Sequence, residues 1–396
     1  MKDRRPRRRL NPDEDELIQA YRNGEISINF KNDENFIEKE SLRLSKAKQR
    51  LQDMNIYNKK LLREQARGEN VLVEMNKKLI SLIEEEGLKI KTVKHKSRAK
   101  KPMLVLQLSD LHLNEIINIR SNKYDFYVAA QRLKLLAEET KRIGKAYGCK
   151  ELFIAVLGDL LNSDRRLDEI LGNATNRMKA TQLSVILLSE FLLDLNEEFN
   201  IQLAGVTGNE ARAKEHLSWD ELLTTDSYDF LIYDTLRLMF KDKKGFKFAM
   251  MQANEAVVNI GNKHILLAHG HQLGKSGDMQ KKVQETVGRY THVYGINIDY
   301  VLSGHIHSAY ICDYFARNSS LAGSNAYSEE ALNYVSRASQ NVHIFDMEKD
   351  LVNSFKIDLN DVTDQQGYPL EEHIDAYNAK SVSKTKEETV ILKIVV

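Results

Sequence analysis

The stretch MLVLQLSDLHL, residues 103–113, places a hydrophobic strand directly before two side chains that can bind a metal ion. The apolar run MLVLQL (103–108) predicts a buried strand, and Asp110 and His112 follow it. Side chains of an extended chain alternate between two faces, so Asp110 and His112 would point to the same side. We therefore expect both to reach one ion.

Four later segments repeat this layout, each with polar residues at the end of an apolar run. The runs are LFIAVL (152–157), QLAGVT (202–207), ILLA (265–268) and YVLS (300–303). In the same order, they precede Gly158-Asp159, Gly208-Asn209-Glu210, His269-Gly270-His271 and Gly304-His305-Ile306-His307. Open α/β sheets place their sites at the carboxyl ends of strands, so the pattern predicts one metal site built from five strand ends. The reaction class it indicates is metal-assisted attack of water on a phosphate ester.

The composition fits a soluble chain with a substantial core. Of its 396 residues, 42% are hydrophobic. The two cysteines, Cys149 and Cys312, form no CxxC pattern, which argues against a disulfide framework and fits a reducing cytosol. The start MKDRRPRRRL has no apolar segment after it, so it is not a secretory signal. We expect a cytoplasmic protein with no membrane partner.

Charge is distributed unevenly along the chain. Residues 1–101 contain 26 Lys and Arg against 17 Asp and Glu, whereas the whole chain has a net charge of only +1. We read residues 1–12 as a basic disordered arm and 88–101 as a basic linker, which is either a solvated connector or a contact for a phosphate backbone. The basic part therefore predicts a polyanionic partner.

Residues 13–87 predict a helical region with two alternative packings. Apolar residues fall on a and d positions of a heptad frame at Ile37, Leu44, Ala47, Leu51, Met54 and Leu61. This pattern is compatible with an oligomeric coiled coil. The other interpretation is a helical hairpin, broken at Gly68, that packs on its own chain.

After Pro102 short apolar strands alternate with helical stretches at 127–146, 176–196 and 278–290, which predicts an α/β domain over 102–347. Residues 211–263 are more irregular, and we expect helices and an inserted hairpin over the site. Late strands are expected at 341–347, 351–357 and 389–396. The last two belong to a predicted β-rich C-terminal extension, 348–396.

The ordered set D-x-H, G-D, G-N-x, H-G-H and G-H-x-H resembles the calcineurin-like metallophosphoesterase superfamily from Asp110 to His307. The resemblance implies a four-layer αββα sandwich and two divalent metal ions, manganese first, with iron or zinc as alternatives. Two ions roughly 3.5–4 Å apart can clamp a phosphate and activate a bridging hydroxide. Carried over by motif, the first metal takes Asp110, His112 and His307, Asp159 bridges both, and the second takes Asn209, His269 and His305.

Two positions near the predicted ligands leave roles open. His269 and His271 compete for one ligand position, and we favour His269, with His271 near the phosphate. Many members of the superfamily read G-N-H-[DE], where that histidine contacts the phosphate or protonates the leaving group, but here Glu210 stands in its place. Arg212 could hold a phosphate oxygen, Glu210 could donate a proton, and His216 or His271 are further substitutes.

The resulting prediction is a two-metal phosphoester hydrolase acting on DNA or RNA. The basic arm and linker favour nucleic acid. The N-terminal helices, which could bind another copy or a protein partner, are similar in layout to the DNA repair exonuclease branch, which works with coiled-coil ATPase subunits. One alternative is a phosphatase or phosphodiesterase on nucleotides, phosphoproteins or small esters. The other is a binding protein with a vestigial metal site.

Overall fold

The computed structural model describes residues 19, 22–24, 45–46, 48–49, 52–53, 102–214, 220–273, 279–331, 333–347, 349–362 and 365–383. The chain divides into two units, Met1–Lys78 and Leu79–Val396. In the first unit the described positions 19, 22, 45–46, 48–49 and 52–53 are helical. The predicted basic arm, the linker 88–101, the strand 389–396 and His216 lie outside the described residues, and the coiled coil stays a prediction.

A six-stranded sheet carries three of the predicted ligand loops. Its strand order is β13-β12-β1-β4-β5-β6, and β1, β4, β5 and β6 run parallel while β12 and β13 pair antiparallel. The strands are β1 (Met103–Leu108), β4 (Glu151–Val156), β5 (Asn200–Gly205), β6 (Phe246–Phe248), β12 (Ser339–Asp346) and β13 (Leu351–Asp358).

A five-stranded sheet of order β10-β11-β9-β8-β7 carries the other two loops. Here β8, β9 and β11 run parallel, and β7 forms an antiparallel hairpin with β8. The strands are β7 (Glu255–Ile260), β8 (Lys263–Ala268), β9 (Tyr300–Ser303), β10 (Tyr310–Ile311) and β11 (Phe315–Arg317). A separate small ribbon joins β2 (Ile117–Asn118) and β3 (Lys123–Tyr124).

The two large sheets share one buried core. Val105 and Ala155 of the first sheet belong to the same apolar cluster as Ile265, Leu267 and Leu302 of the second. The other faces of β1 and β4 are apolar as well, which is why these strands read as continuous hydrophobic runs rather than as alternating patterns.

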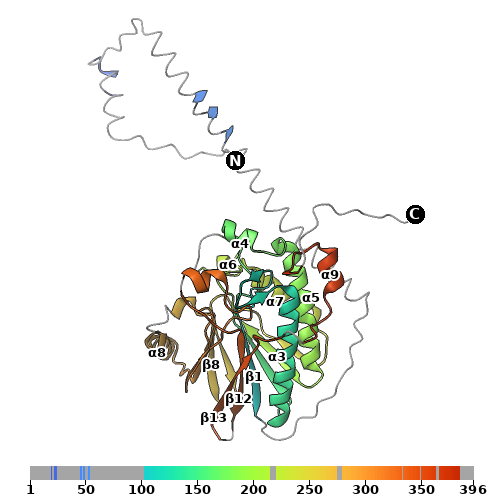
Figure 1. Cartoon of the computed structure of the whole chain (residues 1–396). Coiled ribbons are helices and arrows are strands. Elements are labelled where there is room, and N and C mark those ends of the chain that lie inside the picture. The colour runs from blue at the N-terminus through green and yellow to red at the C-terminus, as the bar shows by residue number, and fades with distance from the viewer. Residues whose placement is uncertain are drawn as a thin grey trace. The chain divides into compact units, whose positions relative to one another are not determined.

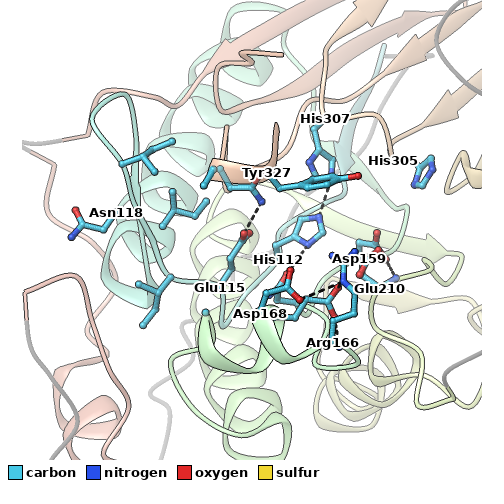
Figure 2. Close-up of a pocket in the computed structure, with 18 residues that line it drawn as sticks. His112, Glu115, Asn118, Asp159, Arg166, Asp168, Glu210, His305, His307 and Tyr327 are labelled. Atoms are coloured by element: carbon cyan, nitrogen blue, oxygen red, sulfur yellow. Dashed lines mark hydrogen bonds and ion pairs between the residues drawn. The ribbon is translucent and has the colours of Figure 1, made fainter. Parts of the chain in front are cut away.

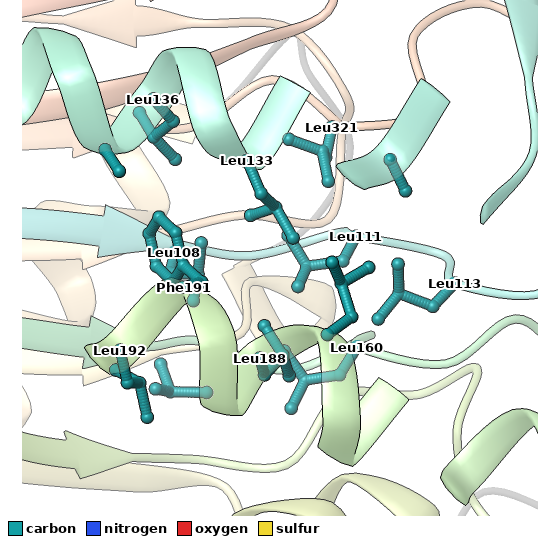
Figure 3. Packing of buried hydrophobic residues seen from close by; sticks show 14 of the residues in the cluster. Leu108, Leu111, Leu113, Leu133, Leu136, Leu160, Leu188, Phe191, Leu192 and Leu321 are labelled. Carbon is teal, nitrogen blue, oxygen red and sulfur yellow. The ribbon is translucent and has the colours of Figure 1, made fainter. Parts of the chain in front are cut away.

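Helices cover the outer face of the six-stranded sheet (Figure 1). They are α3 (Phe126–Ala146), α5 (Arg177–Asn196) and α7 (Tyr228–Met239). The side chains of Asp125 and Asn176 cap α3 and α5 by accepting backbone N–H bonds, which fixes where each helix begins. Leucines and Phe191 from these helices pack on the strand ends, so the loops beyond β1 and β4 rest on an apolar base (Figure 3).

On the outer face of the five-stranded sheet lies α8 (Met279–Arg289), which continues as the π-helical turn η3 (Tyr290–Tyr294). Figure 1 shows α8 on the opposite side of the strands from α3 and α5. The remaining short helices are α4 (Leu167–Leu171), α6 (Glu221–Thr224), η1 (His271–Leu273), η4 (Tyr327–Ala331) and α9 (Glu371–Ala376). None of the described helices is long and apolar enough to cross a membrane.

The observed elements confirm the mixed α/β architecture and correct one detail. The hairpin expected over the site within 211–263 is not an insertion, because β7 pairs with β8 as the edge of the five-stranded sheet. The segment after residue 347 contributes the edge strand β13 and the helix α9. Its residues Leu359, Leu370 and Ile374 belong to the apolar cluster that also contains the buried residues of α3 and α5.

Candidate metal centre

Four of the five loops at the strand ends bring two groups of candidate ligand side chains together. Within each group the ligand atoms lie no more than 4.8 Å from one another. The groups are Asp110, His112 and His307, and Asp159, His269 and His305. Ligands from loops nearly 200 positions apart in the chain therefore meet, as the sequence pattern predicts.

In the first group two imidazole nitrogens face each other. His112 Nε2 lies 3.0 Å from His307 Nε2, and His307 Nε2 lies 3.5 Å from Asp110 Oδ1. A neutral imidazole presents one donor and one acceptor, so two facing nitrogens and a carboxylate form a poor hydrogen-bonded set but a suitable set of ligands for one cation. These side chains thus fit the metal that the motif implies.

His269 is the centre of the second group. Its Nε2 lies 3.0 Å from Asp159 Oδ2 and 2.9 Å from Asn209 Oδ1. Its Nδ1 lies 2.7 Å from the carbonyl oxygen of Leu157. A proton on Nδ1 would donate to this carbonyl and leave Nε2 as the ligand nitrogen. Burial lowers the pKa of His269, but the facing charge of Asp159 outweighs it and raises the pKa to about 10. A cation at this position would supply the same positive charge.

Both predicted carboxylate ligands are fully buried and held by several donors. Burial alone would raise the pKa of Asp159, but His269 holds it well below the usual range, and Asp159 Oδ1 also accepts the backbone N–H of Glu210 at 2.7 Å. Asp110 accepts from Ser109 Oγ at 2.6 Å and from the backbone N–H of His305 at 3.0 Å. Burial opposes ionisation of Asp110 as well, but His307 lowers its pKa.

Glycines precede three of the ligands because there is no room for a side chain. A Cβ on Gly208 would lie 2.1 Å from Asp159 Oδ1, and one on Gly304 would lie 2.2 Å from Asp110 Oδ2. A Cβ on Gly158, whose φ is +86°, would meet the backbone N of Gly208 at 2.2 Å. The G-D, G-N and G-H pairs therefore reflect the close approach of the loops that carry the ligands.

The backbone at the ligands is strained. Five predicted ligands have φ in the left-handed region: Asp110 (52°), His112 (45°), Asp159 (52°), His305 (77°) and His307 (56°). Asp, Asn and His are the non-glycine residues that tolerate this region best, and such strain gathers at functional sites. It also corrects the reasoning from strand alternation. β1 ends at Leu108, so left-handed turns, not a strand, bring Asp110 and His112 together.

Arginines donate to the backbone carbonyl oxygens of the loop that carries Asn209. Arg165 forms an ion pair with Glu210 at 3.1 Å and donates to the carbonyl oxygens of Asn209 and Glu210. Arg212 donates to the carbonyl oxygen of Asn209. Two of the four predicted substitutes for the missing histidine, Glu210 and Arg212, thus already contact other protein groups, and their roles in catalysis stay predictions.

His271 lies on η1, outside both ligand groups. Its ring centroid is 5.5 Å from that of His269 and 6.1 Å from that of His305. Burial, and then the charges of His269 and His305, lower the pKa of His271 to about 3, so it is neutral near pH 7. This position agrees with our preference for His269 as the ligand.

Asp229, which sequence reasoning missed, ties two ligand loops together. It lies in the first turn of α7 and is fully buried. Its carboxylate accepts the backbone N–H groups of Asp159 at 2.9 Å, Leu160 at 2.8 Å and Gly208 at 2.8 Å. No local pattern distinguishes Asp229, because its partners lie 21 to 70 positions away.

A cavity of about 480 Å³ opens beside the ligands (Figure 2). His112, Asp159, His305 and His307 line one part of it. Its other lining residues include Glu115, Arg166 and Tyr327, none of which the motif identified. Of the predicted catalytic residues, Glu210 lines this cavity too.

Comparisons with known proteins do not assign the chain to a family. No family model matches it, and no curated protein matches it either. Among solved structures, Vps29 from Cryptosporidium parvum is 12% identical with a TM-score of 0.30, covering 66% of this chain and 100% of that one. The sulfate thiohydrolase SoxB from Thermus thermophilus is 11% identical with a TM-score of 0.35, covering 72% and 61%. A 5'-nucleotidase from Candida albicans is 10% identical with a TM-score of 0.35, covering 72% and 59%. TM-scores this low carry no functional argument, so function has to be inferred from the site.

Proposed function

We propose that the protein is a metal-dependent phosphoester hydrolase. One observation carries the proposal: two adjacent groups of Asp and His side chains, all buried except the partly exposed His305 and His307, meet at the strand ends, with Asn209 beside the second. The donor set mixes imidazole nitrogens with carboxylate and amide oxygens, which suits manganese, iron or zinc. We take manganese as the first candidate and two ions as the expected number. We also propose that the two sheets and their outer helices form the four-layer αββα sandwich.

Two bound divalent cations would supply Lewis-acid stabilisation of the phosphate and activation of water. The side chains of the protein would bind these ions and contact the phosphate. Asp159 is the candidate shared ligand because it has two carboxylate oxygens. Asn209 offers a neutral oxygen, which limits the negative charge near the phosphate. His271, neutral at pH 7, is a candidate hydrogen-bonding partner for a phosphate oxygen.

Glu210 occupies the position of the missing histidine, and it lines the cavity. Its side chain pairs with Arg165 at 3.1 Å and accepts from Asn209 Nδ2 at 2.8 Å. We infer that Glu210 orients Asn209 and the substrate. Turnover of Glu210→Gln and Arg212→Ala tests both predicted roles, and unchanged kcat and KM in each variant would reject them.

More specifically, we propose that the substrate is a nucleic acid and that the protein is a nuclease. Both proposals rest on the excess of basic residues in 1–101, which contains 26 Lys and Arg against 17 Asp and Glu. Partner or self-association through the N-terminal helices is proposed on their sequence alone, as is a cytoplasmic location.

The test measures manganese content together with hydrolysis of bis(p-nitrophenyl) phosphate and p-nitrophenyl phosphate. Asp159→Asn is compared with Asp242→Asn, which replaces an aspartate whose side chain is 89% exposed. We expect turnover and two bound ions in the wild type and in Asp242→Asn, and loss of both in Asp159→Asn. Bound metal without turnover on any ester would instead indicate a binding protein with a vestigial site.

The nuclease proposal is tested by incubating the protein and manganese with end-labelled single- and double-stranded DNA and RNA. Cleavage by the wild type and not by Asp159→Asn would establish a nuclease, and the product ladder would distinguish exonuclease from endonuclease attack. Oligonucleotide binding that survives in Asp159→Asn would support recruitment by the basic residues before Pro102. Hydrolysis of small esters alone would point to the alternative substrate class.

A further inference from the structure

The cavity beside the metal ligands extends past them into a region with a different lining. Three segments that carry no predicted ligand form this region: 115–119, 166–172 and 325–327. The total volume of about 480 Å³ lies within the range of roughly 300–1,000 Å³ typical of small-molecule sites. A phosphate at the ligands would leave room here for the group esterified to it.

Hydrogen bonds join these three segments to one another. Asn325 Nδ2 donates to Glu115 Oε1 at 2.8 Å, and the backbone N–H of Ile116 donates to the carbonyl oxygen of Gly172 at 2.8 Å. The three segments that form the cavity wall are therefore joined by hydrogen bonds within the protein. Such a preformed space can select a ligand by shape.

Arg166 and Tyr327 form a pair at the cavity. The guanidinium carbon of Arg166 lies 6.0 Å from the ring centroid of Tyr327. A flat ring inserted between them would need about 3.5 Å on each side, or about 7 Å in all. The side chain of Arg166 is 61% exposed and Tyr327 is 58% exposed, so an outward movement of about 1 Å can open this gap. Guanidinium planes and phenol rings both stack on aromatic and heteroaromatic rings.

Acidic side chains dominate the rest of the lining. Glu115, Asp168 and Glu169 line this part of the cavity, and Arg166 is the only Lys or Arg among the described lining residues. Glu169 already pairs with Arg166 at 2.8 Å. Asp168 pairs with Arg166 as well, at 3.7 Å. One guanidinium cannot balance all three carboxylates, so a second phosphate on the substrate would meet a lining with net negative charge.

We propose that this cavity binds the leaving group of the substrate and selects a phosphoester with one flat aromatic or heteroaromatic ring and no second phosphate. Tyr327 stacks on the ring, Arg166 covers its other face, and Glu115 and Asp168 disfavour additional phosphates. The inference rests on the proposed function, which supplies the phosphate position. Of the two substrate classes proposed above, it supports the small ester and opposes the polynucleotide.

Binding to the manganese-loaded protein tests the stacking without requiring turnover. Calorimetry compares benzylphosphonate with cyclohexylmethylphosphonate, which has the same anionic group on a puckered ring. A purely apolar wall would bind the cyclohexyl compound at least as well, whereas stacking favours the benzyl compound. We expect Tyr327→Leu to weaken benzylphosphonate binding by about five- to a hundredfold, the range for loss of one aromatic stack, and Tyr327→Phe to preserve it. Tyr294→Leu is the matched control, since Tyr294 is 60% exposed and lies on η3.

Hydrolysis tests the charge of the lining. We expect a lower KM for thymidine 5′-monophosphate than for thymidine 3′,5′-bisphosphate or for oligonucleotides. Equal affinities for the two phosphonates, unchanged binding in Tyr327→Leu, or a preference for the bisphosphate or for oligonucleotides would each overturn the inference. Failure to hydrolyse any ester, with the benzyl preference intact, would instead overturn the proposed function and leave the subsite standing.

Discussion

Replacement of Asp229 by asparagine tests whether one buried carboxylate holds the two central ligand loops in place. Asp229 Oδ2 accepts from the backbone N–H groups of Asp159 and Gly208, and Oδ1 accepts from Leu160. An asparagine keeps one oxygen in place of two. It can retain the first two bonds, but its NH₂ group would then face the N–H of Leu160.

The magnitude follows from these contacts. One buried N–H without an acceptor costs about 1–3 kcal/mol, and the two retained bonds lose their charge assistance. Burial, and then the charge of Asp159, raise the pKa of Asp229 to about 6, so removing the buried charge offsets part of the loss. We expect the free energy of unfolding to fall by about 1–3 kcal/mol. We expect manganese affinity to fall about 10- to 100-fold, as for other residues that orient metal ligands.

Urea unfolding and a calorimetric manganese titration measure the two effects. Asp234→Asn is the control, because Asp234 lies on the same helix and pairs with Arg237 only three positions away. Asp229→Asn with wild-type manganese affinity would refute the reasoning even if the variant were less stable. It would mean that Asp159 and Asn209 keep their positions without this carboxylate.

Three further predictions concern the site and the core. Gly208→Ala should abolish binding of the second ion, since its Cβ would lie 2.1 Å from Asp159 Oδ1, while Gly288→Ala on α8, with nothing within 4 Å, should bind two ions as the wild type does. Manganese at about 100 times its Kd should stabilise the wild type by about 2.7 kcal/mol for each ion bound, and a melting temperature that EDTA leaves unchanged would argue against metal binding. Burial lowers the pKa of His343 to about 3, so below pH 6.5 the unfolded chain takes up a proton that the folded protein excludes. As the pH is lowered through this range, the free energy of unfolding should therefore decrease by about 1.4 kcal/mol per pH unit. In urea unfolding from pH 7 to 5, His343→Gln should lessen this fall and the surface variant His264→Gln should not.

The sequence predicted the candidate ligands that the structure brings together because each follows a run of apolar residues, and such runs end where a buried strand leaves the sheet. The strand expected at 103–108 is β1, and the one expected at 300–303 is β9. Helices expected at 127–146 and 176–196 begin at Phe126 and Arg177, next to the capping residues Asp125 and Asn176. Local periodicity and helix caps determine these features, so one chain suffices to predict them.

Contacts between distant loops could not be predicted in this way. The ion pair of Arg165 with Glu210 spans 45 positions, and the contact between Arg166 and Tyr327 spans more. Hydrophobic periodicity says which face of an element is buried, but not which polar side chain meets it from another loop. The same limit applies to Asp110 and His112. Strand alternation predicted that these two side chains lie close together, which they do, but left-handed turns rather than an extended strand bring them there.

The strain at the ligands bears on whether the metal site is in use. Five ligand residues adopt left-handed φ values, each at a cost of order 1–3 kcal/mol. Asp110 and Asp159 are fully buried carboxylates, and burial opposes their ionisation. The two sheets, which share an apolar core, can hold this arrangement, but the strands themselves do not require it, because they end before the candidate ligands begin. A vestigial site would be free to lose the glycines at 158, 208 and 304 or to relax these turns. The presence of both the glycines and the left-handed turns supports a site that still binds cations. Loss of the second ion in Gly208→Ala would therefore test this interpretation directly.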